Sequence, residues 1–301
     1  MSAVTIAPDI QKALDASRPV VALESAVITH GLPKAAAIEA VKRQSDACRK
    51  GGAEPAVVAV FEGELRVGLS LDECKALSER SDAAKVSPWN LAAAIVSPGY
   101  GGTTVAATIL AAVQAGLAVV STGGIGGVHP GANGQDVSAD LTELGRRSVC
   151  VVCAGPKSTL DTATTIERLE TLGVPVVGWR SSLLAGFLAT SAGIRVPLRA
   201  DSIEGLASIV RQHWALGGAG VVVSQPLTGD LAIPQHELHQ SDDAIPSVHG
   251  PARTPAELSA LQERLGDRVI EANVALLQRN AALAASLAGA LRRETLHAGP
   301  R

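Results

Sequence analysis

The feature that most constrains the fold is an alternation of short apolar runs with Ala-rich segments of helical length. Such alternation is typical of βαβ units, in which crossover helices of about 10–15 residues join buried parallel strands. Apolar residues make up 47% of the chain but aromatic residues only 2%, so aliphatic side chains must build the core. We therefore predict an α/β fold, a mainly parallel sheet sandwiched by helices (α/β/α). The expected strands lie within 20–23, 55–63, 117–124, 149–155, 174–179 and 220–226, and the expected helices include 104–116, 162–173 and 202–217.

Three further segments have recognisable patterns. Glu62-Gly63 separates two apolar stretches and predicts a hairpin, which would add an antiparallel piece to the sheet. Residues 255–293 have the apolar periodicity of one or two long amphipathic helices. Residues 234–254 are polar and Pro-rich, which predicts a surface loop. Since no internal repeat or charged linker divides the chain, we expect residues 1–301 to form a single domain.

Composition excludes several classes of protein. A net charge of −3 lacks the basic excess of a nucleic-acid groove, so we expect no nucleic-acid partner. The N-terminus has no basic stretch followed by an apolar one, and no uninterrupted apolar run approaches the ~20 residues of a membrane span. Four scattered cysteines do not form a disulfide framework. We expect a cytoplasmic enzyme with no membrane partner.

Chemically useful residues follow three of the expected strands. Glu24 follows the run at 20–23, a Ser-Thr-Gly-Gly segment ends the run at 117–124, and Lys157 comes just after the run at 149–155. In open parallel sheets, ligands bind beyond the carboxyl ends of the strands. These ends are predicted to converge on one rim, where a carboxylate, a Gly-rich loop and a lysine would share a cleft.

Two Gly-rich segments are candidates for anion binding. The segment 122–131 is not a dinucleotide fingerprint, because His129 occupies the third glycine position. It could be a structural turn or a loop whose backbone N–H groups bind an anion. The segment 99–108 leads into an expected helix N-terminus, which favours phosphate. Together the two segments favour anion binding.

Lys157 lies in AGPKST, which is not a Walker A motif because Pro156 separates the glycine from the lysine. A nucleotide-dependent kinase is therefore disfavoured. A lysine beyond a buried strand becomes a nucleophile when burial or a neighbouring cation lowers its pKa, and Lys85 is a candidate for that cation. By residue type alone, both lysines are more often solvated surface charges.

Asp136 and Asp140 are four residues apart, a spacing that would place both carboxylates on one face of a helical turn. One interpretation is a site for Mg²⁺ or Mn²⁺, and the alternative is acidic residues at a helix N-terminus. Cys150 and Cys153 lie three apart in an apolar strand, so we expect two buried thiols on opposite faces.

Six ordered blocks of the chain resemble the pseudouridine-5′-phosphate glycosidase family, which includes indigoidine synthase A-like proteins. The blocks are VALESAVITHGLP at 21–33, GGTTVAATILAAVQAG at 101–116, STGGIGGVH at 121–129, DVSADLTEL at 136–144, VVCAGPKSTLDTATTIERLETLGVPVVG at 151–178 and ANVALLQRNAALAASLA at 272–288.

The resemblance implies roles for individual residues. Lys157 matches the family's Schiff-base lysine and Glu24 its proton donor. Asp136 matches the ligand of a divalent metal, usually Mn²⁺, for which Mg²⁺ is the alternative. The resemblance also implies a homotrimer. Residues matching substrate contacts, or lying in blocks that line the same pocket, are Lys85, Val105, Ser138, Ala139, Asp140, Thr122, His129 and Asn273.

The resemblance implies formation or cleavage of a C-glycosidic bond with ribose 5-phosphate. The chain departs from the family at Lys34–Ala37, at Ser87-Pro88-Trp89-Asn90, at Pro130 and at 181–190. Because these positions flank the expected pocket, we expect C-ribosylation of an aromatic, polyketide-type acceptor, as in antibiotic biosynthesis. Cleavage of pseudouridine 5′-phosphate to uracil and ribose 5-phosphate is the alternative, and a non-catalytic sugar-phosphate binding protein is the alternative from another class.

Overall fold

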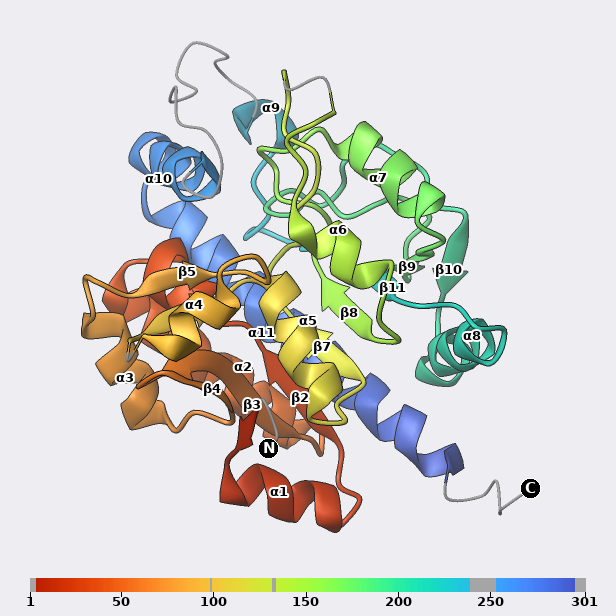
Figure 1. Ribbon diagram of the computed structural model, residues 1–301. Helices are drawn as coiled ribbons and strands as arrows, with labels where there is room; N and C mark the ends of the chain where they lie inside the picture. Colours follow the sequence, from red (N-terminus) through yellow and green to blue (C-terminus); the bar gives the residue numbers. More distant parts are fainter. Residues whose placement is uncertain (1–3, 98, 132–133, 239–252, 296–301) are drawn as a thin grey trace.

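The computed structural model describes residues 4–97, 99–131, 134–238 and 253–295. Within these residues eleven strands form one sheet, whose main path runs β1-β4-β3-β2-β7-β8-β11-β9-β10 (Figure 1). The strands β5 and β6 branch from β3 at the side of this path. The strands are β1 (Thr5–Ile6), β2 (Val20–Leu23), β3 (Glu54–Phe61), β4 (Glu64–Val67), β5 (Ala84–Val86), β6 (Gly101–Thr103), β7 (Val119–Ser121), β8 (Cys150–Cys153), β9 (Val176–Trp179), β10 (Leu198–Ala200) and β11 (Val221–Ser224).

Helices cover both faces of this sheet, as predicted. The core on one side includes α2, α8 and α11, and the core on the other side includes α1, α5, α6 and α7. The helices are α1 (Pro8–Asp15), η1 (Val27–Gly31, a π-helical turn), α2 (Lys34–Lys50), α3 (Leu71–Glu79), α4 (Leu91–Val96), α5 (Val105–Gln114), α6 (Ala139–Leu144), α7 (Thr162–Thr171), α8 (Ile203–Ala215), α9 (Gln235–Leu238), α10 (Arg253–Leu265) and α11 (Asp267–Thr295).

The central strands are apolar throughout because they are buried on both faces. In β2, Val21 and Leu23 face the core beneath α2 and α11, while Val20 and Ala22 face the opposite core. The same alternation places Cys150 and Cys153 in different cores, which confirms two buried thiols on opposite faces. Burial raises the pKa of both thiols, so neither is a reactive nucleophile.

The antiparallel part of the sheet is the predicted hairpin. The strands β3 and β4 pair antiparallel, and β6 also pairs antiparallel with β3. Glu62 and Gly63 connect the hairpin with φ values of 54° and 78°. Two consecutive positive φ angles give a turn whose twist matches that of the strands it joins.

The C-terminal pattern forms two helices, and Gly266, with a φ of 64°, separates α10 from α11. The segment 267–292 of α11 is long and apolar enough to cross a membrane by length and composition, but 67% of its apolar 18-residue window is buried inside the protein. It packs against α2, β7 and β8, as a core helix does. The expected surface loop at 234–254 contains the short helix α9, and 239–252 lies outside the described residues.

Candidate active site

The carboxyl ends of three adjacent strands form the rim of the site. The strands β2, β7 and β8 are neighbours in the sheet, and they lead into Glu24, the Thr122 loop and the Lys157 loop. The predicted convergence is confirmed. All the residues predicted for the site line one pocket with a volume of about 310 Å³: Glu24, Lys85, Val105, Thr122, His129, Asp136, Ser138, Ala139, Asp140, Lys157 and Asn273.

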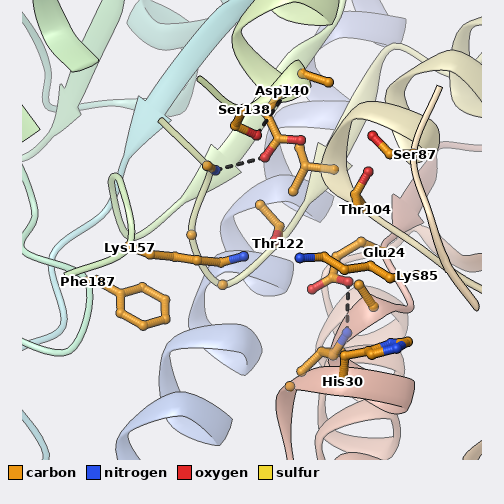
Figure 2. Close-up of a pocket in the computed structure, with 18 of the residues that line it drawn as sticks. Glu24, His30, Lys85, Ser87, Thr104, Thr122, Ser138, Asp140, Lys157 and Phe187 are labelled. Atoms are coloured by element: carbon orange, nitrogen blue, oxygen red, sulfur yellow. Dashed lines mark hydrogen bonds between the residues drawn. The ribbon is translucent and has the colours of Figure 1, made fainter. Parts of the chain in front are cut away.

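Glu24 points into the pocket from the end of β2 (Figure 2). The π-helical turn η1 begins three residues later, and its first backbone N–H, from Val27, donates a 3.0 Å hydrogen bond to Oε2 of Glu24. The carboxyl keeps an opening to the pocket but is otherwise enclosed by protein. Burial raises the pKa of Glu24 above its ordinary value, although the Lys157 charge and the Val27 N–H oppose this effect. Such a carboxyl keeps its proton at a higher pH than a surface glutamate.

Lys157 and Lys85 extend toward one another across the pocket, and the Glu24 carboxyl lies close to the Lys85 side (Figure 2). The Lys157 backbone is anchored by a 3.1 Å hydrogen bond from its N–H to the carbonyl of Ile125. The preceding Gly155 has a φ of 87°, and a Cβ there would lie 2.3 Å from the carbonyl oxygen of Ala185. Only glycine at position 155 therefore lets the backbone pass this close to the Ala185 carbonyl on its way to Lys157.

Lys85 comes from β5, a strand too short to be recognised by its apolar pattern. Asn90 stabilises the turn after this strand, because its Nδ2 donates to the Lys85 carbonyl at 3.1 Å and its Oδ1 accepts from the Ser87 N–H at 2.8 Å. Burial and the neighbouring Lys157 charge lower the pKa of Lys85 to about 8. The two lysines are therefore close enough for their charges to interact, and the shift falls on Lys85, which was predicted only as the neighbouring cation.

Asp136 and Asp140 do not share a helical face, so that prediction was wrong. Asp136 precedes α6 in a bend, and α6 begins only at Ala139, with Ser138 as its N-cap. Ser138 Oγ accepts a 3.2 Å hydrogen bond from the Asp140 N–H. A serine side chain that caps a helix in this way ends the helical geometry just before it, which separates the two acids.

The buried Asp140 carboxylate joins two parts of the rim. Its Oδ1 accepts from the Ala106 N–H at 2.8 Å and its Oδ2 accepts from the Gly126 N–H at 2.7 Å. Asp140 therefore ties the Gly-rich loop to the first turn of α5, in addition to lining the pocket. This bridging role could not be read from residue spacing.

One end of the pocket is suited to an anion. The hydroxyls of Ser87, Thr104 and Ser138 gather there, near the start of α5 (Figure 2). Thr104 is the N-cap of α5, and no hydrogen bond from the Val105 N–H is formed within the described part of the chain. Hydroxyls and a helix N-terminus favour a phosphate group.

Several pocket residues were not predicted. His30 lies six residues after Glu24 in the same sequence block, but the sequence does not reveal that a π turn directs it to the pocket. Phe187 lies beside Lys157 (Figure 2) and has a φ of 61°, in the left-handed region that non-glycine residues rarely adopt. Trp89 lines the pocket with 73% of its surface exposed. Trp89 and Phe187 are two of only six aromatic residues in the chain.

The helix α11 lines the pocket from the C-terminal part of the chain, and α10 approaches the pocket residue His129. Asn273 of α11 lines it, and Asn280, two turns further along, donates from Nδ2 to the carbonyls of Thr122 at 2.8 Å and Gly123 at 3.3 Å. His129 is buried, and its Nδ1 lies 3.8 Å from the Glu257 carboxylate of α10. The Gly-rich loop is therefore held by α11 from one side and by Asp140 from the other.

The site provides few ligands for a metal. Within the described residues there is no cluster of three or more His, Cys, Asp or Glu side chains that could hold a metal ion. Both carboxylate oxygens of Asp140 accept backbone hydrogen bonds, which leaves Asp136 as the predicted ligand. Asp136 fits a hard cation such as Mn²⁺ or Mg²⁺ only where water and a substrate phosphate complete its coordination.

Solved structures of known proteins share this fold along almost their entire length. An indigoidine synthase A-like protein from Thermotoga maritima superposes with a TM-score of 0.90 and 34% identity, over 97% of this chain and 98% of that one. The prealnumycin C-glycosynthase AlnA, solved in complex with ribulose 5-phosphate, superposes with a TM-score of 0.89 and 32% identity, over 98% of each chain.

Sequence comparison gives closer relatives. A pseudouridine-5′-phosphate glycosidase from Mesorhizobium japonicum is 43% identical over 301 residues, covering 96% of this chain and 97% of the relative. Another from Methylobacterium nodulans is 42% identical over 294 residues, covering 95% and 87%. The family described as "Indigoidine synthase A like protein" matches residues 9–290. The chain therefore belongs to the indigoidine synthase A-like family, a family of glycosidase-type enzymes.

Proposed function

We propose that this protein forms or cleaves a carbon–carbon glycosidic bond to ribose 5-phosphate through a Schiff base on Lys157. The observation that carries the proposal is the meeting of an amine, Lys157, and a carboxyl with a raised pKa, Glu24, in one pocket that also has an end suited to an anion. A Schiff base requires an amine, an aldehyde and a nearby proton donor, and ring opening of ribose supplies the aldehyde.

The chemistry explains why a lysine would be needed. A C-glycosidic bond has no heteroatom leaving group to protonate, so catalysis by two carboxylates is poorly suited to it. In the open-chain sugar, C1 is an aldehyde that Lys157 attacks, and loss of water gives an iminium. In bond formation the attacking carbon adds to the iminium carbon. In cleavage the lone pair of the Lys157 nitrogen bonded to C1 re-forms the iminium, and the electron pair of the C1–carbon bond leaves with the acceptor carbon. Glu24 holds the proton that ring opening and closing exchange with the ring oxygen.

The phosphate group would occupy the end of the pocket formed by Ser87, Thr104, Ser138 and the start of α5. Hydroxyl donors, the N-terminus of a helix and the charge of Lys85 provide the binding energy away from C1. The reacting carbon would then lie near the middle of the pocket, where the Lys157 amine is found. Because the hydroxyl groups and the helix N-terminus at this end favour an anion, a sugar phosphate suits the pocket better than a free sugar.

Asp136 would hold Mn²⁺ or Mg²⁺ together with water and substrate, and the cation would offset the charge of the phosphate. The test compares turnover and substrate binding with and without a chelator, in the native protein and in Asp136→Asn. We expect the chelator to weaken substrate binding in the native protein, with recovery on adding Mn²⁺. In Asp136→Asn the chelator should have little further effect. An unchanged affinity in the chelated native protein contradicts the role.

Two acceptors remain candidates, and different observations favour them. The relatives at 42% and 43% identity are pseudouridine-5′-phosphate glycosidases, which favours uracil. The structural similarity to AlnA and the two aromatic residues in the pocket, Trp89 and Phe187, favour an aromatic acceptor. Incubation with pseudouridine 5′-phosphate separates them: release of uracil at an ordinary enzymatic rate excludes the aromatic acceptor as the main substrate, and no release favours it.

Borohydride trapping tests the Schiff base itself. Ribose 5-phosphate and borohydride should give a stable adduct on Lys157, located by peptide mass spectrometry. Lys157→Met removes the amine and should give no adduct. The matched control Lys85→Met should still give a detectable adduct on Lys157. A native protein that binds ribose 5-phosphate without forming an adduct would instead be a non-catalytic sugar-phosphate binding protein.

A further inference from the structure

The pocket has two chemically different ends, separated by the two lysines. Ser87, Thr104 and Ser138 lie on one side of Lys85 and Lys157, while His30 lies on the other side (Figure 2). Suppose that a sugar phosphate binds with its phosphate near Ser87, Thr104 and Ser138 and with its C1 at Lys157. A group bonded to C1 then extends away from these three side chains. His30 lines the pocket on that side of the lysines, beneath Lys85 in the view.

The local structure fixes the orientation of the His30 ring. His30 belongs to the π-helical turn η1, and its Nδ1 lies 2.6 Å from the Thr29 hydroxyl. Thr29 is itself packed tightly, because a Cβ added at Gly102 of β6 would lie 2.2 Å from its Oγ1. With Nδ1 engaged, Nε2 is the ring nitrogen available to a ligand. Single π-helical turns occur frequently at functional sites because they redirect side chains within a helix.

His30 also has the charge state of a base. Burial and the positive charge of Lys85 lower the pKa of His30 below its ordinary value. The imidazole is therefore neutral at neutral pH and able to accept a proton. Burial shifts the pKa of Glu24 in the opposite direction, above its ordinary value, so the two groups differ in their tendency to hold a proton.

We propose that His30 is the general base for the acceptor, removing the acidic N–H or O–H proton of a planar ring as a ring carbon bonds to C1. The inference rests on the proposed function and adds a catalytic residue to it. Phe187, whose ring lies beside Lys157, would form an apolar wall for such a ring.

The step is balanced in atoms and electrons. The acceptor proton moves to Nε2, and the electron pair left behind is conjugated through the ring to form the bond from the ring carbon to C1. The electron pair of the C1–nitrogen double bond returns to the Lys157 nitrogen. The hydrogen on the attacked ring carbon then leaves as a proton to water, its bonding electrons restore the ring double bond, and the proton on His30 restores the N–H or O–H. The ring-closing hydroxyl of the sugar then bonds to C1 as the C1–nitrogen bond breaks, and its proton goes to the released Lys157 amine. Cleavage follows the same steps in reverse.

The test separates adduct formation from carbon–carbon chemistry in His30→Gln. Borohydride trapping with ribose 5-phosphate requires only Lys157 and its proton donor, so the variant should form the adduct at a rate within about threefold of the native protein. Turnover of pseudouridine 5′-phosphate, or of ribose 5-phosphate with uracil or 1-naphthol, should fall about 100-fold or more. The control is His236→Gln, an exposed histidine of α9 outside the pocket, which should change neither rate.

Each outcome decides the question. Retained turnover in His30→Gln overturns the inference, and so does a loss of adduct formation equal to the loss of turnover, since that would make His30 structural. If His30→Gln does not fold, His30→Asn is measured against the same two criteria. A native protein that forms no adduct, or that turns over no acceptor, contradicts the proposed function and not the assignment of His30 alone.

Discussion

Asp140 accepts a 2.7 Å hydrogen bond from the backbone N–H of Gly126, and this bond connects α6 to the Gly-rich loop of the site. The other oxygen of the same carboxylate bonds to α5. A carboxylate, which only accepts hydrogen bonds, is matched to two converging N–H donors. The rim of the site is thus assembled around the buried Asp140 side chain.

The first prediction concerns this bridge. Asp140→Asn places an NH₂ group against one of the two N–H donors and leaves a buried donor unsatisfied, which should cost about 1–3 kcal/mol of unfolding free energy. Turnover should fall as well, because the Gly126 loop and the start of α5 lose their common anchor. Urea unfolding and steady-state kinetics measure both effects. Asp201→Asn, in an exposed ion pair with Arg199, is the control and should leave both quantities nearly unchanged.

The second prediction concerns Glu24. In Glu24→Gln the amide oxygen can still accept the Val27 N–H, so stability should be kept while the proton donor is lost. Turnover should fall by about 10²–10⁴-fold. Burial raises the pKa of Glu24, so the native protein should keep the protonated form above the usual range of a carboxyl and lose activity as pH rises through that raised pKa. If Glu24→Gln loses activity at alkaline pH in the same way as the native protein, the alkaline loss of activity belongs to another group.

The third prediction concerns Lys85. Burial and Lys157 lower its pKa from 10.5 to about 8, a penalty on the charged form of about 3 kcal/mol. Between these two values the unfolded chain binds a proton that the folded protein has released, so the free energy of unfolding should rise with pH. Lys85→Met should lack this rise and be more stable than the native protein at pH 7. Its KM for a phosphorylated substrate should be higher. Chemical denaturation at pH 7 and pH 10 and substrate titration measure these effects, and equal pH dependence in both proteins would contradict the assignment.

The fourth prediction concerns Asn280, which bonds to the Thr122 and Gly123 carbonyls from α11. Asn280→Leu keeps the branched shape of the side chain but leaves these carbonyls without their donor, so stability should fall by about 1–3 kcal/mol. The pocket should also bind substrate less well, because the Thr122 loop is freed. Asn280→Gln, which retains an amide, should recover part of the affinity. Calorimetric Tm and a KM measurement are sufficient, and a variant with normal KM and lowered Tm would limit Asn280 to a structural role.

The sequence by itself determined the central strands of the sheet, several of the covering helices and the rim. Runs such as 20–23 and 149–155 are apolar throughout because strands buried on both faces require it, and that requirement is local to each run. Glu24 and Lys157 could be placed on a common rim because parallel strands bring their carboxyl ends together.

Tertiary structure decided the details of the site. The three-residue strand β5 is defined by pairing with β6, and its own residues carry no periodic signal. The start of α6 at Ser138, the π turn that presents His30 and the bond from Asn280 to the Thr122 loop are settled only in the folded chain. Residue spacing predicts which side chains are neighbours along one helix or strand. Helix caps, π turns and bridging carboxylates form where the packed fold leaves backbone N–H groups that still need a hydrogen-bond acceptor.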